Sequence, residues 1–210
     1  NNLGNTLKEL GQLEAAVKRY KQALRVKPDY AEVHSNLGNA LQELGQLKAA
    51  VKYYEQALVI KPNYAEAHYN LSNTLKDLDQ LEAAVKHYEQ ALVIKPDYAD
   101  AHYNLANTFK GLEQPDEAIK CYKKALAIQP DYADAKLNLS LAQLLSGDLQ
   151  EGWKNYQWRW TQKDFEPKRS NSTFPWEGSS ITNKILFVYC EQGIGDEIMF
   201  SSCIPDLIAQ

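Results

Sequence analysis

The chain has 210 residues, of which 44% are hydrophobic and 24% are charged, and its formal net charge is −4. This composition is typical of a soluble globular protein, and the mild excess of acid gives no electrostatic basis for binding nucleic acid or an anionic membrane. The longest purely apolar run, residues 185–190, is too short to cross a bilayer. Three widely spaced cysteines favour a reducing, cytoplasmic environment over a disulfide framework.

A unit of 34 residues is repeated along most of the chain. Each copy is marked by a proline that precedes Asp-Tyr or Asn-Tyr and then alanine; the four are Pro28, Pro62, Pro96 and Pro130. Apolar residues at helical spacing predict one helix over 31–44 and another over 47–59, with Gly45 as the turn between them. Because one unit cannot bury its apolar faces alone, the pattern predicts an all-α, right-handed superhelix of stacked helix pairs.

The turn and the fifth unit vary from this pattern. Asp79 and Glu113 replace the turn glycine in the third and fourth units, so the turn does not depend strictly on glycine. In the fifth unit three tryptophans follow one another closely, and we expect them to cap the last open face of the stack; they are Trp153, Trp158 and Trp160. The repeat domain is therefore predicted to span 1–160.

The remaining residues change in character. Residues 161–183 have little periodicity and are interpreted as a linker. Residues 184–210 begin with a continuous apolar, β-rich run and continue through a glycine turn into a helical segment, which is typical of the first strand, turn and helix of an α/β domain. Since the last segment ends inside what reads as a helix, we expect the chain to be a piece of a longer protein.

Asparagines are the main candidates for a binding site. They recur three residues apart on one face of the first helix of each unit, as the series Asn2, Asn36, Asn70, Asn104 and Asn138 and the series Asn5, Asn39, Asn73 and Asn107. Because leucines take the buried face, these amides are expected on the inner, concave side, where they could bind the backbone of an extended peptide. The alternative is that they bond to neighbouring helices or are simply solvated. The tyrosines at equivalent positions are interpreted as core: Tyr20, Tyr54, Tyr88 and Tyr122.

Other polar residues carry weaker indications. His34, His68 and His102 occur one per repeat, so they would lie in parallel rather than converge, and no metal site is predicted. Glu32, Glu66, Asp100 and Asp134 open the first helix of each unit, where acids complement the helix dipole. These acids argue against a groove that clamps a C-terminal carboxylate, and they favour a neutral or basic extended ligand.

The first four units closely resemble tetratricopeptide repeats, with signature positions occupied by Leu37, Gly38, Ala50, Tyr54, Ala57 and Pro62. The Asn-Leu-Gly-Asn variant is most similar to the repeat arm of O-linked N-acetylglucosamine transferases. That resemblance implies a role for the inner asparagines in holding extended peptide.

The tail resembles a bacterial class in which such repeats precede a glycosyltransferase-like domain of heptosyltransferase type. The matching pieces include Glu151-Gly152-Trp153 and the segment from Glu191 to Asp196. The resemblance implies that Asp196 lies near the acceptor, where it could act as general base, and that a full-length enzyme would use a nucleotide-sugar donor. Gly193 and Gly195 could face a phosphate, although for this chain the favoured interpretation is that both glycines form a turn and Asp196 caps the helix.

These observations leave two readings of function. In the first, the repeats form a protein-interaction scaffold that recruits extended segments for an attached glycosyltransferase. In the second, the chain is a non-catalytic adaptor, or it self-associates through exposed repeat ends. No cofactor is expected within this chain, and whether the whole protein is an enzyme stays open.

Overall fold

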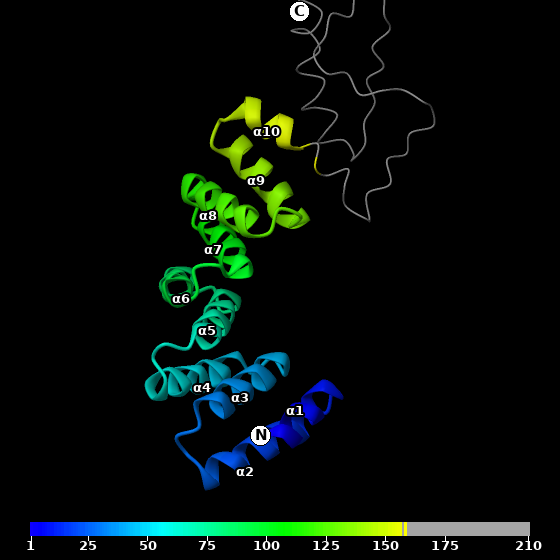
Figure 1. The fold of residues 1–210 in the computed structure, drawn as a ribbon, viewed down its shortest axis with the longest axis vertical. Helices are drawn as coiled ribbons and strands as arrows, with labels where there is room; N and C mark the ends of the chain where they lie inside the picture. The colour runs from blue at the N-terminus through cyan, green and yellow to red at the C-terminus, as the bar shows by residue number, and fades with distance from the viewer. Residues whose placement is uncertain (157, 159–210) are drawn as a thin grey trace, which may run out of the picture. The chain divides into compact units, whose positions relative to one another are not determined.

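A computed structural model describes residues 1–156 and 158, and residues 1–158 form one compact unit. The described residues fold into ten α-helices, which follow one another as five antiparallel pairs along the stack (Figure 1). Their bounds are α1 Asn2–Glu9, α2 Leu13–Val26, α3 Ala31–Glu43, α4 Leu47–Ile60, α5 Ala65–Asp77, α6 Leu81–Ile94, α7 Ala99–Gly111, α8 Pro115–Ile128, α9 Ala133–Leu145 and α10 Leu149–Tyr156. The predicted helix pairs are confirmed, and in the second unit their bounds agree within one residue.

Small residues allow the two helices of a pair to approach closely, and a tyrosine fills the space beside them. The second-helix alanines Ala16, Ala50, Ala84 and Ala118 are fully buried, as are Tyr20, Tyr54, Tyr88 and Tyr122. At Gly38 the approach is so close that an added Cβ would lie 2.7 Å from the Tyr54 ring. The interpretation of these tyrosines as core is therefore confirmed.

The turn inside each pair requires a left-handed backbone conformation. Gly11, Gly45 and Gly147 have φ values of 71°, 71° and 86°. Asp79 and Glu113 adopt the same conformation, with φ values of 60° and 57°, although side chains disfavour it. The turn thus keeps its geometry without glycine, as the sequence indicates.

The second helix of each pair ends before a proline, because the residue preceding proline disfavours the helical conformation. Helix α4 ends at Ile60, and Lys61 leaves the helix with φ −133° and ψ 84°. Helix α6 ends in the same way before Pro96. The equal spacing of the prolines therefore sets the equal length of the second helices.

Two of the three tryptophans that are expected to cap the stack are described: Trp153 lies in α10 of the fifth pair, and Trp158 follows that helix. Trp158 packs against the core and lies under the ammonium group of Lys136, 5.8 Å from the ring centroid. Trp153 contacts Tyr156 edge to face at 5.6 Å. Trp160, the linker 161–183 and the strand-turn-helix segment 184–210 lie outside the described residues, so these remain predictions. None of the described helices combines the length and apolarity that crossing a bilayer requires.

Candidate functional site

Each buried tyrosine needs an acceptor for its hydroxyl group, and an asparagine 15 residues earlier supplies it. The tyrosine Oη donates to the asparagine Oδ1 at 2.5–2.7 Å in four pairs: Tyr20–Asn5, Tyr54–Asn39, Tyr88–Asn73 and Tyr122–Asn107. Burial raises the pKa of Tyr54, Tyr88 and Tyr122, so these hydroxyls stay protonated and keep donating at physiological pH. This bond joins the two helices of one pair.

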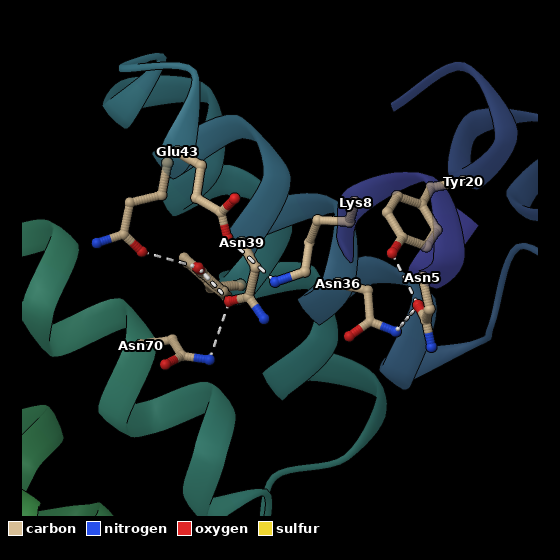
Figure 2. Close-up of polar contacts among 9 residues, drawn as sticks. Asn5, Lys8, Tyr20, Asn36, Asn39, Glu43 and Asn70 are labelled. Atoms are coloured by element: carbon tan, nitrogen blue, oxygen red, sulfur yellow. Dashed lines mark hydrogen bonds and ion pairs between the residues drawn. The ribbon is translucent and has the colours of Figure 1, made fainter. Parts of the chain in front are cut away.

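A second set of bonds joins one repeat to the next. Asn36 Nδ2 donates to Asn5 Oδ1 at 3.1 Å, Asn70 Nδ2 donates to Asn39 Oδ1 at 3.0 Å, and Asn138 Nδ2 lies 3.4 Å from Asn107 Oδ1. Figure 2 shows the first two of these bonds, together with Tyr20 and its bond to Asn5. We call these bonded side chains the asparagine row: Asn5, Asn36, Asn39, Asn70, Asn73, Asn104, Asn107 and Asn138.

Two tyrosines on the first helices take part at the C-terminal end of the asparagine row. Asn104 Nδ2 donates to Tyr69 Oη at 2.8 Å, and Asn138 Nδ2 donates to Tyr103 Oη at 3.0 Å. Each of these tyrosines also stacks on a tyrosine at the start of the next repeat, with centroid distances of 4.7 Å for Tyr69–Tyr98 and 4.8 Å for Tyr103–Tyr132. The alternative that the amides bond neighbouring helices is therefore realised along the whole row. Asn2, which the sequence grouped with the row, is exposed at its N-terminal end.

The two asparagine series are left with different free groups. Within the described residues, the amide nitrogens of Asn5, Asn39 and Asn107 donate no hydrogen bond, since their contacts are made through Oδ1. The side-chain carbonyl oxygens (Oδ1) of Asn36, Asn70 and Asn138 accept none there, because these side chains bond through Nδ2. None of these atoms belongs to the buried polar atoms that lack a partner, so they reach solvent. The row thus presents free N–H donors from one series and free carbonyl acceptors from the other.

The acids at the helix starts are partly engaged within the protein. Glu32 Oε1 pairs with Lys61 Nζ at 3.3 Å, and Asp100 Oδ1 accepts from Tyr132 Oη at 3.1 Å. A hydrogen bond from its own backbone amide, assisted by Lys61, lowers the pKa of Glu32. These contacts fit the role of first-turn acids in stabilising the helix.

The histidines of the first helices bind carbonyl groups. In His34, His68 and His102, Nε2–H donates to the carbonyl oxygen of the proline six residues earlier, at 2.8–3.0 Å. The third unit adds His87, whose Nδ1 lies 3.1 Å from Nδ1 of His68. Since the proton of His68 is on Nε2, His87 Nδ1–H is the donor of this bond. In the part of the chain that the structure describes, no three potential ligands are grouped to hold a metal ion.

The histidine pair predicts a dependence of stability on pH. Burial lowers the pKa of both rings, and for His87 the neighbouring His68 lowers it further. The unfolded chain therefore binds protons first as the pH falls below about 7. The contribution of the two neutral histidines to the free energy of unfolding is fully present above that pH. It is lost as the pH falls towards their lowered native pKa values.

We expect the melting temperature to fall by about 2 °C between pH 7.5 and 5.5, a small change because both rings are only half-buried. His87→Tyr, which copies the residue found at Tyr53 in the second unit, should reduce this fall. Thermal unfolding followed by circular dichroism at both pH values checks it. Equal slopes in the two proteins would show that the pair does not carry the effect.

Cys121 is buried, and burial raises the pKa of its thiol to about 11, so it is an unreactive packing residue. Asp196, Gly193 and Gly195 lie outside the described residues.

Comparison with known proteins gives matches along the repeats. The model described as TPR repeat matches residues 4–45 and 73–113, and two models described as tetratricopeptide repeat match residues 31–64 and 99–132, and residues 53–86. Among curated proteins, protein FlbA of Caulobacter vibrioides is 33% identical over 66 residues. That match covers 31% of this chain and 11% of the relative, so the chain spans only a small part of the relative's length.

Solved structures share the fold. A crystal structure of MamA superposes with a TM-score of 0.71 at 26% identity, over 74% of this chain and 91% of that one. YrrB, described as a TPR protein with an unusual peptide-binding site, superposes with a TM-score of 0.68 at 21% identity, over 76% of this chain and 82% of that one.

Proposed function

Because the chain belongs to the tetratricopeptide repeat family, we propose that it is a protein-interaction scaffold whose asparagine row binds an extended segment of a partner protein. The observation that carries this proposal is that one asparagine series has free hydrogen-bond donors and the other has free acceptors. Asn5, Asn39 and Asn107 have free side-chain N–H donors, and Asn36, Asn70 and Asn138 have free side-chain carbonyl acceptors. An extended peptide presents both kinds of group at regular intervals, so its backbone can bond to both series.

The tyrosine bonds support binding in a second way. Asn39 is held by Tyr54 and by Asn70, so its amide is oriented before any ligand arrives. A side chain that is already ordered loses less conformational entropy on binding. The peptide-binding site named for YrrB, whose fold is similar, is consistent with this use of the surface.

For a longer protein, we propose that the scaffold recruits protein substrates to a glycosyltransferase domain. This rests on the resemblance of the C-terminal motifs to repeat proteins with such a domain, and it assigns the catalytic base to Asp196 and the donor site to residues beyond Gln210. Nucleotide-sugar turnover by the full-length protein tests the idea: Asp196→Asn should abolish transfer and leave folding intact, and unchanged turnover would refute the assignment.

An array of randomised peptides of about twelve residues tests the scaffold function itself, since that length spans about four repeats when extended. The labelled 210-residue chain should be retained by many unrelated sequences and by few that contain proline, which lacks the backbone N–H. If no peptide retained the chain above the level of a denatured control, the proposed function would be wrong.

A further inference from the structure

The asparagine row is bordered by a third polar position in each repeat. This border consists of the residues three positions after Asn5, Asn39, Asn73 and Asn107, namely Lys8, Gln42, Lys76 and Lys110. At this spacing each border residue shares a helix face with its asparagine. Figure 2 shows Lys8 and its partner Glu43 beside Asn5 and Asn39, so the border lies next to the row.

In the first two repeats the border residue bonds to an acid 35 positions later. Lys8 Nζ pairs with Glu43 Oε1 at 3.0 Å, and Gln42 Nε2 donates to Asp77 Oδ2 at 3.4 Å. The bond has the same register in both cases. It joins the border residue of one repeat to the residue that directly follows the border position in the next repeat. In both repeats, the partner of the border side chain at this register is therefore a carboxylate.

The following two repeats lack that carboxylate. The position 35 residues after Lys76 is Gly111, and the position 35 residues after Lys110 is Leu145. Neither lysine makes an ion pair or a side-chain hydrogen bond within the described residues. The ammonium groups of these two lysines, on the first helices α5 and α7 of successive repeats, thus lack the carboxylate partner that Lys8 has at the same register.

Stabilisation of the helix dipole does not account for these lysines. A basic residue in the last turn favours a helix, and Lys76 and Lys110 occupy that turn in α5 and α7. Helices α3 and α9, however, form without any basic residue in their last turn. The lysines are therefore not required for the helices to end where they do.

We propose that Lys76 and Lys110 bind two acidic side chains of the extended partner segment, which makes acidic sequences the preferred ligands of the C-terminal half of the asparagine row. This inference rests on the proposed function. Packed helices lie roughly 8–10 Å apart, and an extended chain advances about 3.3 Å per residue. Successive lysines therefore match acids about three residues apart.

This proposed preference differs from the neutral or basic ligand expected from the acids at the helix starts. Two of those acids are already bonded, Glu32 to Lys61 and Asp100 to Tyr132. At the border positions of the C-terminal half, the charged side chains are the lysines Lys76 and Lys110.

The randomised peptide array also tests this inference, with the wild-type chain and a Lys76→Gln/Lys110→Gln variant as probes. Peptides retained by the wild type should be enriched in Asp or Glu about three residues apart. The variant should bind an acidic peptide from that set about five- to tenfold more weakly and its Gln-substituted twin unchanged. Lys52→Gln/Lys86→Gln is the matched control, because it removes two exposed lysines one repeat apart on the second helices.

A second variant supplies the missing acids instead of removing the lysines. Gly111→Glu/Leu145→Glu restores the register seen at Glu43, and both sites have room. An added Cβ at Gly111 meets only the end of the flexible Leu81 side chain, at 3.2 Å, and Leu145 is 70% exposed. This variant should unfold at the same temperature or higher and should lose the preference for the acidic peptide. Equal binding of the acidic peptide by wild type and both variants would overturn the inference while leaving the scaffold function in place, whereas failure to retain any peptide would overturn both.

Discussion

Replacing Tyr54 by alanine is expected to destabilise the repeats by about 3–5 kcal/mol, the range for deleting a fully buried aromatic side chain. Tyr54 is 0% exposed, its ring lies against Gly38, and its Oη lies 2.6 Å from Asn39 Oδ1 and 3.1 Å from Gln42 Oε1. The loss is a large part of the roughly 5–15 kcal/mol that stabilises a typical domain. Urea unfolding followed by circular dichroism measures it.

Tyr54→Phe separates the contribution of the packed ring to stability from that of the hydroxyl group. It keeps the packing and removes one donor, while Asn39 Oδ1 still accepts from Asn70. We expect a loss of about 1 kcal/mol. If both substitutions lowered stability equally, the hydroxyl bond would dominate, and the main role assigned to the packed ring would be wrong.

Asn39→Asp combined with Asn107→Asp is expected to weaken peptide binding at least about tenfold, with little change in stability. Aspartate keeps the oxygen that accepts from Tyr54 or Tyr122 and from the next asparagine. It removes the N–H donors that we assign to the ligand, and its charge repels peptide carbonyl groups. Fluorescence anisotropy with an uncharged peptide from the array gives the change in affinity.

The same substitution in the other series is the control. Asn70→Asp removes the donor to Asn39 Oδ1 and sets two acceptors against each other, so it should lower stability. A stable Asn39→Asp/Asn107→Asp protein that binds peptide as tightly as the wild type would rule out the amide donors as the binding groups.

The fold could be predicted because proline and alanine positions recur at equal spacing. Pro62 marks the end of α4 within two residues, and Ala50 marks the contact between α3 and α4. Local chemistry of this kind needs no knowledge of distant contacts. The prediction for residues 184–210 also rests on local sequence, an apolar run followed by a glycine turn, and it stays a prediction because these residues lie outside the described part of the chain.

The bonding of the site was harder to predict, although one signal was present. The constant separation of 15 residues between Asn39 and Tyr54, and between their equivalents, pairs a buried hydroxyl with an acceptor. This relation is visible only in the joint spacing of tyrosines and asparagines, and not in either series alone. The pairing of Lys8 with Glu43 depends on which helix faces meet between repeats. The contact of His68 with His87 depends on how the two helices of one repeat pack. Both therefore required the three-dimensional structure.

The equal spacing of the asparagine row has a consequence for how a ligand moves. In the proposed complex, a segment held only by these repeated bonds can slip by one repeat, or about three residues of extended chain, and meet similar donors and acceptors. Several alignments are then close in energy, and exchange among them competes with release, so the proposed bound state is a set of interconverting frames. In the C-terminal half of the row, the ammonium groups of Lys76 and Lys110 would, under the proposal made for them, favour a single frame for a segment with acids at matching positions.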